Sequence, residues 1–200
     1  MIIGIDIDDT ITDTYEVTFN YAQDYTINVL KRDGQIHEID CNTHMYAKSL
    51  CGWKDDEDID FFRMYYERII NETKPKTLAL EYLNKLHEDG NKIVIITARW
   101  ETDYIDVKKL TEEWIKKYNI PCDKLIINAE NKGVAALEEN VDVFIDDSYR
   151  NCKAISNLGI KTYIMDTRVN RNLNDEKIKR VYSWPHFYKE LEEYKEEANK

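Results

Sequence analysis

The sequence predicts an α/β protein, in which a parallel β-sheet carries helices on both faces and a small, mostly helical cap is inserted after the first strand. Short Ile- and Val-rich segments alternate with amphipathic helical patterns along most of the chain, which is typical of a parallel sheet. The alternation is interrupted once, over residues 14–74. Because a structureless loop of that length is improbable in a compact domain, the interruption predicts a separate folded module.

Apolar runs bounded by polar residues predict the strands of the sheet. Continuous runs, rather than alternating ones, indicate strands that are buried on both faces. Strands that alternate with helices imply right-handed crossovers, and therefore a Rossmann-like sheet covered on both sides. The predicted strands are Ile2–Ile7, Lys92–Thr97, Lys124–Asn128, Val141–Ile145 and Lys161–Met165.

Amphipathic segments between the strands predict the helices. Thr77–Glu88 places its apolar residues on one face and ends shortly before Gly90, which is a C-terminal helix signal. Asp103–Tyr118 repeats the pattern and is followed by Pro121. The Lys- and Glu-rich end, Tyr188–Lys200, is expected to be a solvated helix that frays.

The inserted segment has helical patterns of its own. Tyr15–Tyr25 and Asp58–Ile70 are predicted helices on either side of an irregular middle. The acidic run Asp55–Asp60 is expected in the first turn of the second helix, where carboxylates offset the positive end of the helix dipole. The predicted domains are a discontinuous core of residues 1–13 and 75–200 and a cap of residues 14–74.

Composition limits the partners of the chain. A net charge of −11 disfavours a nucleic-acid polymer or an anionic membrane as partner. A small anionic substrate remains possible, because one metal ion reverses the field inside a pocket. The N-terminus lacks a signal-peptide pattern, no run is long enough to span a bilayer, and the four cysteines form no CxxC pair, so a cytoplasmic protein with reduced thiols is expected. The oligomeric state stays open.

Polar side chains follow three of the predicted strands, in the segments Asp6–Thr10, Thr97–Arg99 and Asp146–Ser148. Because ligands of parallel α/β sheets bind beyond the carboxyl ends of the strands, these side chains are expected to converge on one crevice. Carboxylates packed this closely repel each other unless a cation neutralises them, and hard oxygen ligands suit Mg²⁺. Lys132 opens a helix before the fourth strand, and its ammonium group can reach the same crevice. A single Asp after a strand is often only a helix cap, but all the pieces in order favour a site.

These segments resemble the four motifs of the haloacid dehalogenase (HAD) phosphatases. The motifs read IIGIDIDDT, IVIITAR, NKG and VFIDDS here, and the resemblance extends from the N-terminus to about Asp166. The insertion directly after the first motif resembles the family's first type of cap. A finer resemblance, to the 5'(3')-deoxyribonucleotidases and related bacterial nucleotidases, rests on ITAR, IDDS and a late DTRVNR…VYSW segment.

The resemblance implies a magnesium-dependent phosphomonoesterase. Asp6 would attack phosphorus and form an aspartyl phosphate, and Asp8 would protonate the leaving oxygen and then activate water. Magnesium would be held by Asp6, the Asp8 carbonyl, Asp146 and Asp147. The phosphoryl group would be held by Thr97, Ala98 and Lys132. One departure from the family pattern is Asp9, where many members have Gly at a position whose backbone shape Asp also adopts.

The resemblance also implies a small phosphorylated metabolite as substrate, with a nucleoside 5'-monophosphate favoured. The cap is rich in aromatic rings that suit stacking on a nucleobase, although rings at helical spacing are mostly expected in the cap core. Arg99 and Trp100 follow the second motif and are expected to face the entrance and touch substrate. For Arg99, a surface pairing with a helix carboxylate is the alternative.

Other functions stay open at this point. The chain can be a phosphatase for another small metabolite such as a sugar phosphate, or a non-catalytic binding module on the same fold. A polynucleotide 3'-phosphatase is a further alternative, which the acidic surface disfavours. A structural zinc site is also considered, but its spacing matches no common zinc module, and ordinary packing is favoured. Its candidate ligands are His37, Cys41, His44 and Cys51.

Overall fold

The computed structural model describes residues 1–38 and 46–198, and at its centre is a six-stranded sheet in the order β3-β2-β1-β4-β5-β6. Every strand pair is parallel, which confirms the predicted fold class. The last strand was not predicted, because its four residues include two charged ones and it lies at the edge of the sheet. The strands are β1 (Ile2–Ile5), β2 (Lys92–Ile96), β3 (Lys124–Ile126), β4 (Val143–Asp146), β5 (Lys161–Met165) and β6 (Ile178–Val181).

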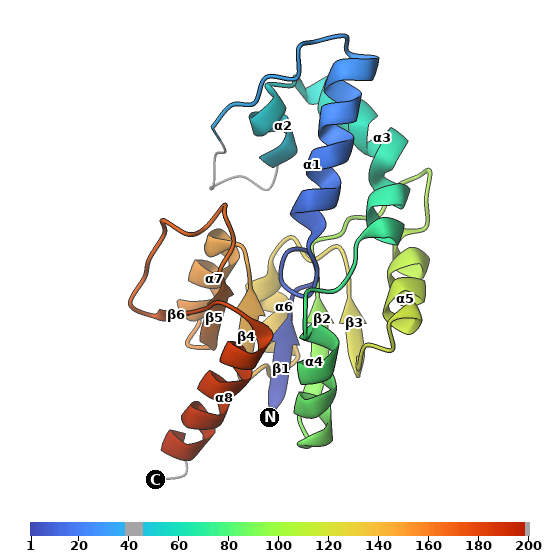
Figure 1. Cartoon of the computed structure of the whole chain (residues 1–200). Helices are drawn as coiled ribbons and strands as arrows, with labels where there is room; N and C mark the ends of the chain where they lie inside the picture. The colour runs from blue at the N-terminus through green and yellow to red at the C-terminus, as the bar shows by residue number, and fades with distance from the viewer. Residues whose placement is uncertain (39–45, 199–200) are drawn as a thin grey trace.

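Helices cover both faces of the sheet (Figure 1). Apolar residues of α4 (Ala79–Glu88), α5 (Val107–Lys117) and α8 (Trp184–Ala198) pack with one set of strand side chains. Apolar residues of α6 (Lys132–Glu138) and α7 (Tyr149–Ser156) pack with the opposite set. Within the described residues, none of the helices combines the length and the apolar character needed to cross a bilayer.

A glycine in β1 makes room for an aromatic ring of the neighbouring strand β4. A Cβ atom at Gly4 in β1 would lie 2.4 Å from the ring of Phe144 in β4, so only glycine leaves room for that ring. Phe144 is fully buried and packs against the helices of its face. The packing of the Phe144 ring therefore fixes β4, which is the neighbour of β1, the strand that carries the first motif.

The C-terminal helix differs from its prediction. It begins at Trp184, earlier than expected, and it is not merely solvated. Trp184, Phe187 and Leu191 are at most 1% exposed and belong to the main core. The indole N–H of Trp184 also donates to the carbonyl oxygen of Thr10 at 3.2 Å. These three residues recur at helical spacing, which indicates a helix with one buried face. The surrounding charged residues obscured that pattern.

The inserted segment forms helices beyond the carboxyl ends of the strands (Figure 1). They are α1 (Thr14–Asp24), the π-helix η1 (Tyr25–Val29), α2 (Tyr46–Cys51) and α3 (Asp55–Glu72). Most of the cap's aromatic rings pack together, since Tyr25, Trp53 and Phe61 form an apolar cluster that is separate from the sheet core. Tyr65 and Ile69 of α3 are buried in the same cluster and Phe62 packs against it, so the expectation that residues at this helical spacing form cap core is confirmed.

The two chain crossings between sheet and cap are paired with each other. Thr12 and Pro75 form an isolated antiparallel bridge, and the N–H of Lys76 donates to the carbonyl of Ile11 at 2.7 Å. The ammonium group of Lys76 lies 2.7 Å from Asp13. This pairing supports a boundary near residues 13 and 75, and we retain the division into core (1–13 and 75–200) and cap (14–74) as a proposal.

The acidic run of the cap lies in the first turn of α3, as predicted. One of its carboxylates, Asp58, is only 3% exposed, and its Oδ1 has no hydrogen-bond partner within the described part of the chain. Burial raises the pKa of Asp58 from 3.8 to about 6, and Lys48 opposes the shift. Between those two values the folded protein binds a proton that the unfolded chain does not. Stability from this group is therefore full below about pH 3.8 and is lost as the pH rises through about 6.

Asp58→Asn is expected to raise the free energy of unfolding at pH 7.5, by up to about 3 kcal/mol, because it removes a buried charge and keeps the side-chain shape. Thermal unfolding at pH 7.5 and at pH 4 measures this, and the gain should vanish at the lower pH. Asp56→Asn is the matched control, since Asp56 occupies the same helical turn but is exposed. An equal gain from both substitutions would contradict the explanation.

Candidate active site

A buried lysine joins two carboxylates at the carboxyl edge of the sheet. Asp6 directly follows β1, and Asp146 ends the neighbouring strand β4. Lys132, the first residue of α6, places its Nζ 2.5 Å from Asp6 Oδ1 and 2.8 Å from Asp146 Oδ2. Each of the three side chains is at most 5% exposed. The first, third and fourth motif residues thus meet in one ion-paired cluster.

The same edge holds a group of oxygens that fits a divalent cation. Asp6, Asp146 and Asp147 each offer a carboxylate oxygen, and these atoms lie within 4.8 Å of one another. Burial raises the pKa of Asp6 to about 7, although Lys132 opposes the shift. Burial, followed by the charge of Asp9, raises the pKa of Asp147. Keeping these carboxylates ionised therefore costs free energy in the folded protein, and a hard cation such as Mg²⁺ would reduce that cost.

Neighbouring polar groups orient the two central carboxylates. The backbone N–H of Ser148 donates to Asp146 Oδ1 at 2.8 Å, and the amide of Asn151 lies 3.3 and 3.4 Å from the two oxygens. The hydroxyl of Thr10 donates to Asp6 Oδ2 at 3.3 Å. Asn151 was missed from the sequence, although its place in the first turn of the helix after the Asp-Asp pair was a usable signal.

Asp8 stands apart from the lysine cluster and is held by an arginine. Arg99 donates from Nε to Asp8 Oδ2 and from its terminal nitrogen to Asp8 Oδ1, both at 2.9 Å. The hydroxyl of Thr14 donates to the same Oδ1 at 2.7 Å. Burial acts to raise the pKa of Asp8, but Arg99 and Thr14 outweigh it and hold the pKa below its usual value. The carboxylate remains one-third exposed.

The residues after β2 differ in where they point. Arg99, which was expected at the entrance, has a side chain that is 3% exposed and faces Asp8. Thr97 is buried, and its hydroxyl accepts the N–H of Arg99 at 3.2 Å, while Ala98 between them is half-buried. Trp100 is 40% exposed and stacks on Tyr66 of the cap helix α3, with ring centroids 4.4 Å apart. Trp100 therefore joins the end of this segment to the cap.

Asp9 adopts the backbone shape expected from the family pattern. Its φ is +58°, in the left-handed region that favours glycine, and Asp tolerates it better than most residues. Its Oδ1 accepts the backbone N–H of Tyr15 at 2.7 Å, at the beginning of cap helix α1. Burial raises the pKa of Asp9 to about 7. Asp9, at a position where many family members have glycine, therefore adds a hydrogen bond between the first motif and the cap.

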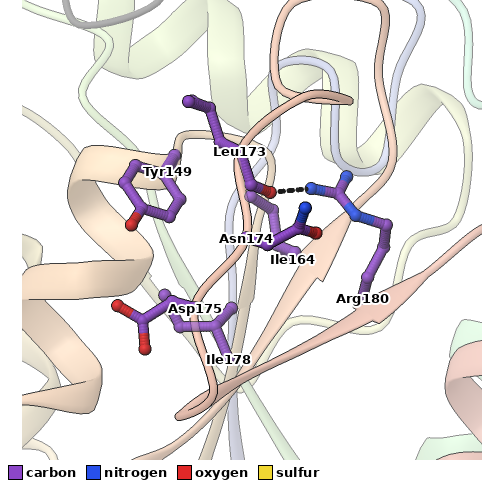
Figure 2. A pocket seen from close by; sticks show the side chains of 7 residues that line it. All are labelled: Tyr149, Ile164, Leu173, Asn174, Asp175, Ile178 and Arg180. Carbon is purple, nitrogen blue, oxygen red and sulfur yellow. Dashed lines mark hydrogen bonds between the residues drawn. The ribbon is translucent and has the colours of Figure 1, made fainter.

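The late segment that follows β5 supports the fourth motif. The amide of Asn170 donates to the carbonyl of Asp147 at 2.7 Å, and Arg180 donates to Asn170 Oδ1 at 2.7 Å. Figure 2 shows Arg180 also reaching the carbonyl of Leu173, beside a small pocket. The volume of this pocket, about 10 Å³, admits at most one water molecule, so it is not a substrate site. Through the hydrogen bond from Asn170, the segment holds the backbone of Asp147 in place.

The candidate zinc ligands of the cap lie partly within the described residues. Cys41 and His44 lie outside the described residues. Cys51 is buried in the apolar cluster of the cap, and its Sγ accepts from the amide of Gln23 at 3.8 Å. That environment agrees with ordinary packing, which the sequence favoured.

Solved structures of similar fold include haloacid dehalogenase-like hydrolases. A hydrolase of this type from Streptococcus pneumoniae superposes with a TM-score of 0.66 at 14% identity, over 96% of this chain and 97% of the other. CbbY from Rhodobacter sphaeroides, solved with xylulose-(1,5)-bisphosphate, superposes with a TM-score of 0.64 at 14% identity, over 92% of this chain and 94% of the other. At these identities, the likeness establishes the HAD fold alone.

Sequence comparison identifies the family. A nucleotidase of Clostridium acetobutylicum is 31% identical over 187 residues, which are 93% of this chain and 91% of the relative. The family model described as 5' nucleotidase, deoxy (pyrimidine), cytosolic type C protein (NT5C) matches residues 1–193. The chain therefore belongs to this 5'-nucleotidase family and is a phosphatase with the HAD fold.

Proposed function

We propose that the protein is a magnesium-dependent phosphatase of nucleoside 5'-monophosphates, with deoxyribonucleotides favoured, and that it acts through an aspartyl phosphate on Asp6. The observation that carries the proposal is the buried cluster of Asp6, Lys132 and Asp146 beside a third carboxylate. The nucleotide part rests on the family and on the nucleotidase relative.

The carboxylates of Asp6 and Asp146 and the carbonyl of Asp8 would hold Mg²⁺, with Asp147 directly beside it. Bound there, Mg²⁺ supplies positive charge that offsets the carboxylates and the phosphoryl oxygens. Lys132 adds a second positive charge from within hydrogen-bond distance of Asp6. Thr97 and the N–H of Ala98 are proposed to bind phosphoryl oxygens as charge develops on them.

Two steps complete the proposed reaction. In the first, an oxygen of Asp6 forms a bond to phosphorus while the bond to the leaving oxygen breaks, and Asp8 gives that oxygen a proton. In the second, Asp8 takes a proton from water, the water oxygen bonds to phosphorus, and the Asp6–phosphorus bond breaks. The products are the alcohol, here the nucleoside, and inorganic phosphate, and Asp6 is regenerated.

Trp100 is proposed to contact the substrate. It lies where the second motif meets the cap, and one face of its indole stacks on Tyr66. Phe62 lies edge-on to the same indole, with ring centroids 4.9 Å apart. A partly exposed indole held by two rings is a rigid surface for a nucleobase, and base–aromatic stacking is typically worth about 1–3 kcal/mol.

The proposal is tested by phosphate release from a panel of 5'- and 3'-nucleotides, deoxynucleotides, sugar phosphates and a 3'-phosphorylated oligonucleotide. Assays with Mg²⁺ and with a chelator run in parallel. We expect release that needs Mg²⁺ and favours nucleoside 5'-monophosphates. Selective hydrolysis of sugar phosphates would overturn the substrate assignment, and activity that survives chelation would overturn the metal assignment.

A further inference from the structure

The buried guanidinium group of Arg99 contacts three neighbouring side chains. Besides its two contacts with Asp8, it lies 3.4 Å from the hydroxyl of Thr111 and 5.6 Å from the ring centroid of Trp114. The backbone of Arg99 is held as well, because its carbonyl accepts the N–H of Asn128 at 2.8 Å. Arg99 therefore has little freedom to turn toward a ligand in the crevice.

The fork of Arg99 determines the orientation of the Asp8 carboxylate. Two parallel N–H···O bonds of 2.9 Å fix both the plane and the position of a carboxylate, which a single ammonium donor cannot do. Thr14 holds the same carboxylate from the beginning of the cap, at 2.7 Å. Asp8 is the more accessible member of this ion pair, since its side chain is 33% exposed and that of Arg99 is 3% exposed.

We propose that Arg99 is a positioning residue, which aims the Asp8 carboxyl group at the leaving-group oxygen and does not itself bind substrate. The inference rests on the proposed function, because it takes Asp8 as the group that exchanges the proton. It replaces the expected substrate contact of Arg99 with an indirect role. The arginine that ends the second motif thereby orients a residue of the first motif that lies 91 positions earlier in the chain.

If Arg99 positions Asp8, the effect of Arg99 on the cleavage rate depends on the leaving group. When the P–O bond of a nucleotide breaks, the departing alkoxide is strongly basic and needs the proton from Asp8. When p-nitrophenyl phosphate is cleaved, the departing phenolate is weakly basic and needs little help. Misaligning Asp8 should therefore slow nucleotide cleavage far more than cleavage of p-nitrophenyl phosphate, as general acid catalysis typically contributes about 10²–10⁴-fold.

The test compares kcat/KM for both substrates in Arg99→Gln and Arg99→Lys, because kcat/KM reports only the steps through formation of the aspartyl phosphate. For Arg99→Gln we expect a loss of about 100-fold with the nucleotide and less than about 5-fold with p-nitrophenyl phosphate. Arg99→Lys keeps the buried charge but loses the fork, so the same selectivity with a smaller loss is expected. Thr111→Val is the matched control, which removes one contact of Arg99 and leaves the fork.

Inhibition by inorganic phosphate separates the indirect role from substrate binding. An unchanged inhibition constant is expected in both Arg99 variants, and a constant weakened in proportion to kcat/KM would overturn the proposal. Equal losses for the two substrates would also overturn it, since they would point to a purely structural role. If Arg99→Gln does not fold, Arg99→Lys decides alone. If the wild-type protein cleaves neither substrate, the proposed function fails first, which is a different outcome from equal losses in an active enzyme.

Discussion

Asp6→Asn is expected to lower kcat for phosphate release by at least about a thousandfold, because the amide oxygen is a poor nucleophile and cannot form the aspartyl phosphate. The substitution changes neither the size nor the shape of the side chain. The loss in kcat is measured by steady-state phosphate release with Mg²⁺. Rapid acid quench of the wild type captures the covalent intermediate.

The folded state should tolerate this change. Burial raises the pKa of Asp6 to about 7, so the charged form of this side chain costs free energy in the folded state. The Asp6→Asn variant, whose amide is neutral, should therefore unfold at a temperature equal to or above that of the metal-free wild type. Asp13→Asn is the matched control, since Asp13 lies in the same loop but is 57% exposed and pairs with Lys76. It is expected to change kcat by less than about twofold. Wild-type turnover by Asp6→Asn would rule out Asp6 as the nucleophile.

Lys132→Met is expected to reduce both activity and stability. The ammonium group neutralises Asp6 and Asp146, and breaking a buried ion pair by removing one partner typically costs about 3–5 kcal/mol. Because the same charge would stabilise the phosphoryl oxygens during transfer, kcat should fall by about 10²–10³-fold. Thermal unfolding and phosphate release, each with and without Mg²⁺, measure the two effects.

Magnesium should partly restore the stability of Lys132→Met, since it would neutralise the carboxylates that the substitution leaves unpaired. Lys124→Met is the control, because Lys124 pairs with Glu139 where the lysine is 53% exposed, and such pairs typically contribute less than about 1 kcal/mol. The explanation would be wrong if Lys132→Met and Lys124→Met were equally stable and equally active.

Features that depend on local pattern could be predicted from the sequence. The central strands are continuous apolar runs because both their faces are covered, and their carboxyl ends had to share one edge of the sheet. That geometry is enough to bring Asp6 and Asp146 to one edge of the sheet, and Lys132 opens the helix that precedes the fourth strand. The first turn of α3 was equally readable, because carboxylates at a helix N-terminus follow from the dipole.

Features that depend on tertiary partners could not be predicted in this way. No local pattern tells whether Arg99 points outward to the entrance or inward to Asp8, because the choice depends on a carboxylate far away in the chain. The edge strand β6 was hidden by Lys179 and Arg180, one exposed and the other reaching back to Asn170. A charged residue in a short strand lowers the apolar signal even when its side chain is used for packing.

The position of β1 in the sheet also affects the order in which the protein can fold during synthesis. Ile3 pairs with Ile93 on one side and with Val143 on the other, so the first strand to leave the ribosome gains its second neighbour only after most of the chain has been made. Until β2 has been made its apolar residues have no sheet to join, and until β4 has been made one of its edges stays unpaired. Such late, long-range pairing makes folding slow and exposes the nascent chain to aggregation. The cap, whose contacts are local, can form first, and the nucleophile's strand is enclosed only when β4 arrives.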